Sequence, residues 1–207
     1  MSSKNKAALV IVVLHVVGTI GMLLPAWAPL MRQLTPLNLL IVAALVVIFQ
    51  QNKTPPFYAY ALLCFLMAFF SEVVGVQTGW PFGSYEYGAT LGPKLFGVPL
   101  LIGTNWLILV VCTASLTRSI NNKWLASLAG ALLMVGLDIL LEPVAIMSDY
   151  WSWQGSGIPI QNYVSWGALA FVLHSILHHF GFENKNELAQ YVILSQASFF
   201  ALVGYLG

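Results

Sequence analysis

Five polar side chains with the capacity for chemistry lie within long apolar runs of this sequence: Glu72, Asn105, Asp138, Glu142 and Asn162. An ionisable side chain at membrane depth is costly and usually marks a functional position. Asp138 and Glu142 are four residues apart, so they share one face of a helix. Because two neighbouring buried carboxylates would repel each other if both were ionised, we expect one to stay protonated at neutral pH. Such a pair suits general acid and base chemistry.

The elements that carry these residues are predicted to be transmembrane helices. Hydrophobic residues make up 59% of the 207-residue chain and charged residues only 7%, whereas a soluble domain carries about a quarter charged residues. Apolar runs long enough to cross about 30 Å of hydrocarbon are expected at 7–24, 35–51, 56–78, 97–117, 123–147, 161–180 and 188–206. The predicted fold is therefore all-α, a polytopic membrane bundle of about seven helices that forms a single domain over 1–207.

Lysine and arginine in the short loops predict the orientation of the bundle, because they gather on the cytoplasmic side. The side of the N-terminus holds Lys4, Lys6, Lys53, Arg118, Lys123 and Lys185, and the other side holds Arg32 and Lys94. We therefore expect a cytoplasmic N-terminus. The formal net charge of +1 argues against a nucleic-acid partner, which would require a basic surface.

The helix rise predicts that the polar residues meet at one depth. At about 1.5 Å per residue, Glu72, Asn105, Asp138 and Glu142 lie about 8–13 Å from the outer membrane face. Asn162 opens its segment at the same face, and Trp166 lies one turn deeper. A structural alternative is a network in which Asn105 and Asn162 satisfy the acids, since no buried lysine or arginine is available as a counter-ion.

Two outer connections, 79–96 and 148–160, are rich in aromatic residues, glycine and proline. These aromatic residues could form an interfacial belt at headgroup level. A structured lid over a membrane-embedded site is the alternative, and it accounts for both the glycine and proline content and the concentration of aromatic residues on one face.

Metal and organic cofactors are not expected. His174, His178 and His179 are similar in pattern to the histidine clusters of membrane di-iron hydroxylases, but those enzymes need more histidines than the four present here. We interpret these histidines as interfacial. The chain also has no nucleotide or haem signature.

Several blocks between about 70 and 166 together resemble a known family. They are 72–85, 91–93 with 97–99, Asn105-Trp106, 138–143, 150–153, Ile158-Pro159 and 162–166. These blocks are similar to the carotenoid biosynthesis membrane protein family, whose characterised members are carotenoid 1,2-hydratases, including the bisanhydrobacterioruberin hydratase type. The resemblance implies a cofactor-independent hydro-lyase in a prokaryotic plasma membrane, with a carotenoid in the bilayer, water and other carotenoid biosynthesis enzymes as partners.

Such an enzyme adds water across the terminal C1–C2 double bond of an acyclic carotenoid. Protonation of C2 gives a tertiary carbocation at C1, which water captures. On chemical grounds we expect Asp138 to donate the proton, Glu142 to orient the water, and Glu72 to stabilise the cation or act as a second base. The expected substrate-binding residues are Trp80, Phe82, Tyr85, Asn105, Trp106, Trp151, Trp153, Asn162 and Trp166. A carotenoid cyclase or isomerase, or a non-catalytic carotenoid or lipid binder, remains an alternative.

Overall fold

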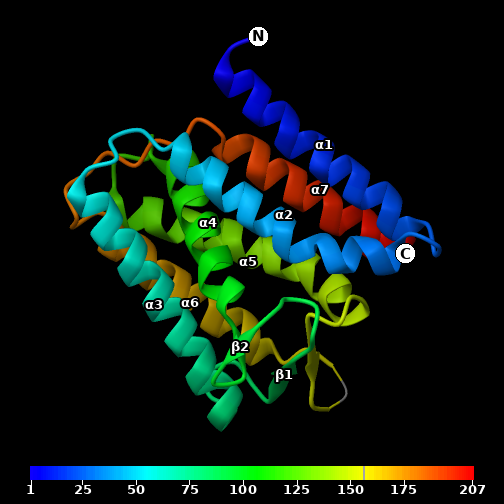
Figure 1. Cartoon of the computed structure of the whole chain (residues 1–207). Coiled ribbons are helices and arrows are strands. Elements are labelled where there is room, and N and C mark those ends of the chain that lie inside the picture. The colour runs from blue at the N-terminus through cyan, green and yellow to red at the C-terminus, as the bar shows by residue number, and fades with distance from the viewer. Residues whose placement is uncertain (156) are drawn as a thin grey trace.

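The computed structural model describes residues 1–155 and 157–207, and within them the chain is a bundle of seven helices (Figure 1). The helices are α1 (Ser3–Leu23), α2 (Ala28–Ile48), α3 (Pro55–Thr78), α4 (Leu100–Thr117), α5 (Lys123–Met147), α6 (Ile160–Leu177) and α7 (Ala189–Leu206). Four short strands accompany them: β1 (Tyr85–Tyr87), β2 (Lys94–Leu95), β3 (Val98–Pro99) and β4 (Trp151–Trp153). The predicted seven-helix bundle is confirmed, but the purely helical expectation missed these strands.

Six of the helices in the described residues, α1 to α5 and α7, are long and apolar enough to cross a membrane. The exception, α6, has 18 residues, as many as α4 and α7. It opens with Gln161 and Asn162 and carries His174, and these polar side chains lower its hydropathy. Asn162 and His174 are buried, whereas Gln161 is exposed and donates a hydrogen bond to the Pro81 carbonyl oxygen.

The largest difference from the predicted boundaries is in α2, which was expected over 35–51 and is found over Ala28–Ile48. Pro29 lies in its first turn, where a proline without an N–H group is tolerated because that N–H has no helical acceptor. The helix therefore begins before the apolar run that was used to predict it. The span predicted at 123–147 coincides with α5.

α4 is the central helix, since it packs against α2, α3, α5 and α7. Its side chains are buried nearly all round, as expected for a helix enclosed by others. α1 packs along α7, and α5 packs along α6 and also against α7 (Figure 1). α2 is mostly exposed apolar surface, with only 11% of its apolar window buried, as suits a helix that faces lipid.

The two aromatic connections meet in an antiparallel ribbon at one end of the bundle (Figure 1). In this ribbon Tyr85 lies opposite Trp153, and Tyr87 lies opposite Trp151. Because side chains alternate along a strand, these four aromatic residues share one face, while Glu86 points away. The two connections thus form one folded unit over the end of the bundle.

Candidate active site

Glu72 of α3 is buried and accepts three side-chain hydrogen bonds. Tyr85 and Tyr87 of β1 donate their hydroxyls to its Oε2 at 2.5 and 2.8 Å, and Trp106 of α4 donates its indole N–H to Oε1 at 3.2 Å. Gly75 permits this approach, because a Cβ there would lie 2.7 Å from the Tyr85 hydroxyl. Burial, and then the proximity of Glu72, raises the pKa of both tyrosines, so they remain protonated donors.

Glu142 of α5 is also buried and surrounded by donors. Trp151 and Trp153 donate their indole N–H groups to its Oε2 at 3.1 and 2.9 Å, and Asn162 donates to Oε1 at 3.1 Å. The ribbon therefore directs its two tyrosines to one carboxylate and its two tryptophans to another. The period-two alternation of each strand makes this possible.

Asp138, one turn before Glu142 on α5, has a different environment. Its Oδ2 accepts a hydrogen bond of 3.0 Å from the same Asn162 amide that reaches Glu142. Its Oδ1 is buried without a hydrogen-bond partner among the described residues. Among the three acids, Asp138 therefore has a free carboxyl oxygen.

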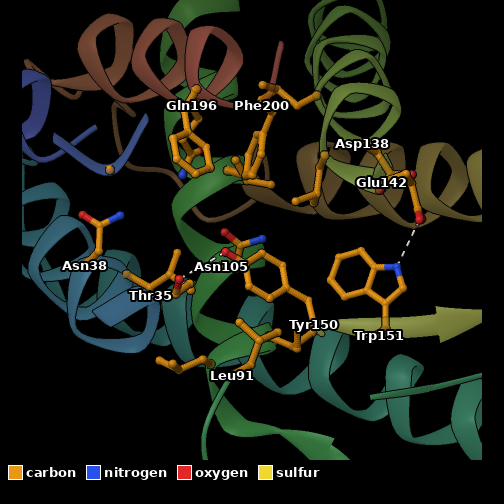
Figure 2. A pocket seen from close by; sticks show the side chains of 18 of the residues that line it. Thr35, Asn38, Leu91, Asn105, Asp138, Glu142, Tyr150, Trp151, Gln196 and Phe200 are labelled. Atoms are coloured by element: carbon orange, nitrogen blue, oxygen red, sulfur yellow. Dashed lines mark hydrogen bonds between the residues drawn. The ribbon is translucent and has the colours of Figure 1, made fainter. Parts of the chain in front are cut away.

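All three acids line one cavity of about 230 Å³. Figure 2 shows Asp138 and Glu142 at its wall. α3, α4, α5 and α6 line it together with strands β1 and β4, and α1, α2 and α7 contribute further lining residues. Trp106 and Trp166 form part of its wall with ring centroids 4.2 Å apart. The lining in the described part of the chain includes no lysine or arginine, so the carboxylates are stabilised by neutral donors.

The comparison with known proteins agrees with this architecture. The family model described as "Carotenoid biosynthesis protein" matches residues 10–206. The chain belongs to this family. Bisanhydrobacterioruberin hydratase of Haloarcula japonica is 33% identical over 127 residues, which are 56% of this chain and 42% of the relative. The match thus spans less than half the length of that relative. No solved structure matches the chain.

In this carotenoid biosynthesis protein, most of the predicted site residues line the cavity. These are Glu72, Tyr85, Asn105, Trp106, Asp138, Glu142, Trp151, Trp153, Asn162 and Trp166. Trp80 and Phe82 do not line it. Trp80 is 69% exposed, and Phe82 is buried behind the ring of Tyr85 with a centroid distance of 6.4 Å. The two residues therefore lie outside the site that the acids form.

The network between amides and acids was predicted only in part. Asn162 bridges Asp138 and Glu142 as the structural alternative required, whereas Asn105 lines the cavity without a hydrogen bond to an acid in the described residues. Two tyrosines were missed as site residues. Tyr87 could have been found from the alternation Tyr-Glu-Tyr, and Tyr150 lines the cavity and forms a 3.1 Å hydrogen bond with Thr35 of α2 (Figure 2).

His174 is the histidine that lies within α6, and it is not interfacial as expected, because it is only 1% exposed. His174 is buried, with its Nδ1 2.7 Å from the Ala170 carbonyl oxygen and its Nε2 2.9 Å from the Thr113 hydroxyl. Within the described residues, no group of three histidine, cysteine, aspartate or glutamate side chains is arranged to hold a metal ion.

Proposed function

We propose that the protein is a hydro-lyase that adds water to the terminal C1–C2 double bond of an acyclic carotenoid. The observation that carries this proposal is the free oxygen of Asp138, which lies buried on a cavity where the other two acids are saturated by donors. The family supports a carotenoid substrate, and the printed name of the Haloarcula japonica relative supports hydration. Adding water changes no oxidation state, so the reaction needs no redox cofactor.

Asp138 is the proton donor in this mechanism. A carboxylic acid carries its proton on one oxygen and can accept a hydrogen bond with the other. Asn162 donates to Oδ2, which leaves Oδ1 to hold the proton that is transferred to C2. A proton on either oxygen of Glu72 or Glu142 would compete with donors already directed at those oxygens, so these acids are suited to remain acceptors.

Glu72 and Glu142 stabilise the carbocation at C1 as fixed negative charges. Opposite charges attract strongly where water is excluded, and the hydrogen bonds of the ribbon hold both carboxylates before the charge develops. The faces of Trp106 and Trp166 add attraction for a cation of about 0.5–2 kcal/mol. We no longer assign the water to Glu142, because its oxygens accept three donors of the protein itself.

The substrate enters from the lipid in this proposal. The cavity reaches the surface where Val17 of α1 and Leu34 and Leu37 of α2 line it, and these side chains are 41–54% exposed. In a bilayer such residues contact acyl chains. A long polyene can therefore insert its end group between α1 and α2 while the rest of the molecule stays in the membrane.

The test is expression in a bacterium that accumulates lycopene, followed by mass spectrometry of the extracted pigments. We expect one water added per modified end. A product isomeric with lycopene would instead indicate a cyclase or an isomerase. Unchanged pigment with the protein in the membrane, also when a longer acyclic polyene is supplied, would favour a non-catalytic binder.

We propose further that the N-terminus is cytoplasmic and that the protein resides in a prokaryotic plasma membrane beside other carotenoid biosynthesis enzymes. In this orientation the acid end of the cavity lies in the outer half of the bilayer. The orientation can be tested with a reporter enzyme that is active only outside the cytoplasm and is fused after α7. We expect an active fusion, and an inactive one would contradict the proposed orientation.

A further inference from the structure

Three amide side chains from three helices line the part of the cavity that lies away from the acids. They are Asn38 of α2, Asn105 of α4 and Gln196 of α7 (Figure 2). Asn38 Oδ1 is buried without a hydrogen-bond partner, and Gln196 is only 5% exposed. In the part of the chain that the structure describes, none of the three forms a side-chain hydrogen bond to another residue. The remaining lining around them is mostly apolar.

Gln196 is buried, and Asn38 and Asn105 are partly buried. An amide that is shielded from water and has no partner loses the hydrogen bonds it would make in water. An apolar polyene cannot supply such a partner. The three amides are neutral and offer both donors and acceptors, so they match a neutral O–H group. A bound water needs about two to four polar partners, and three amides from three helices lining the same cavity can supply that number.

The acid end has few groups left to hold water. Glu72 and Glu142 each accept three donors, and the Asn162 amide is shared by Asp138 and Glu142. The hydration reaction nevertheless consumes a water molecule. We propose that Asn38, Asn105 and Gln196 hold the water that captures the carbocation, an inference that rests on the proposed hydratase function.

The reaction balances with this assignment. Asp138 transfers its proton to C2, and the electron pair of the double bond forms the new C–H bond. The water oxygen then bonds to C1, and one proton of that water returns to the Asp138 carboxylate. The product is a tertiary alcohol, and the acid is restored. The amides position the water and take no part in proton transfer.

The experiment separates water capture from protonation by running the reaction in D₂O. A carbocation that is not captured loses a proton from C2 and returns to the olefin, which leaves deuterium in the recovered substrate. In Gln196→Leu and Asn38→Leu we expect hydration to fall about tenfold, as for loss of one hydrogen bond. The ratio of deuterated substrate to hydrated product should rise by a similar factor. Gln190→Leu and Gln33→Leu, which replace exposed amides of the same helices, should leave this ratio unchanged.

An unchanged ratio in the two cavity variants, with the polyene still bound as judged by its absorption band, would overturn the proposal. If the amides instead hold a hydroxyl of the substrate, the variants would raise KM for hydroxylated carotenoids alone.

A second measurement does not depend on turnover. A structure at a resolution that shows water should contain an ordered water among the three amides, lost in Gln196→Leu. An empty amide site would refute the inference even if hydration occurs, whereas a wild-type protein that neither hydrates nor exchanges would refute the proposed function.

Discussion

Replacing Asp138 by asparagine should abolish most hydration while leaving the structure intact. The amide oxygen of the new side chain can occupy the position of Oδ2 and accept the 3.0 Å hydrogen bond from Asn162. Its NH₂ group then lies where Oδ1 has no partner among the described residues, so it meets no donor. General acid catalysis contributes about 10²–10⁴ to a rate, and we expect hydration to fall by a factor in this range.

The same amide substitution at Glu142 should act differently. Its two oxygens accept three N–H donors, and an amide has one acceptor oxygen. The NH₂ group of Glu142→Gln would face either the indole N–H groups of Trp151 and Trp153, which cannot accept hydrogen bonds, or the amide of Asn162. At least one buried donor loses its partner, at a cost of about 1–3 kcal/mol. We therefore expect Glu142→Gln to unfold at a lower temperature than Asp138→Asn.

Both quantities can be measured on purified protein in detergent. Product mass gives the hydration rate, and the loss of helical circular dichroism on heating gives stability. Glu86→Gln is a suitable control, because Glu86 lies on β1 and its side chain is exposed on the other face of the ribbon. Hydration at the wild-type rate in Asp138→Asn would refute the assignment of the proton donor. Equal stability of Glu142→Gln and wild type would refute the account of the hydrogen-bond network.

Two further substitutions test the entrance and the packing of the bundle. Leu37→Trp should fill the lipid-facing mouth of the cavity and raise KM for a long polyene by about tenfold or more, as overpacking opposes entry. Leu40 is exposed on the same helix but does not line the cavity, so Leu40→Trp should leave KM unchanged. Gly130→Ala would place its Cβ 2.3 Å from Nε2 of His174, so it should destabilise the protein by about 1–3 kcal/mol in thermal unfolding. Gly136→Ala on the same helix, with nothing within 4 Å, should cost no stability.

The membrane helices and the meeting of the acids could be predicted from the sequence because both depend on local regularities. Apolar length identifies a span, and a constant rise per residue places Glu72, Asp138 and Glu142 at one depth. Helices of alternating direction then present these residues at the same membrane face. α2 was misplaced because the prediction relied on the apolar run and did not use the tolerance of a first turn for Pro29.

The residues that donate hydrogen bonds to the acids could not be predicted, because these bonds depend on contacts between segments far apart in the sequence. Tyr87 and Trp151 are 64 positions apart and lie opposite each other in the ribbon, a register that no local pattern fixes. Trp80 was expected in the pocket because it lies in an aromatic segment. Gly79, in the left-handed conformation with φ of 72°, ends α3 just before it, and the chain then turns so that Trp80 is exposed.

The distribution of hydrogen bonds among the acids argues for chemistry at Asp138. Burying a carboxyl group is costly unless hydrogen bonds replace its hydration. The fold supplies those bonds to Glu72 and Glu142 with four aromatic donors from the ribbon and with Trp106 of α4. A network that served stability alone would gain by supplying a donor to Oδ1 of Asp138 as well. Its absence among the described residues leaves a position for a proton at the wall of the cavity, as the proposed protonation of an apolar olefin requires.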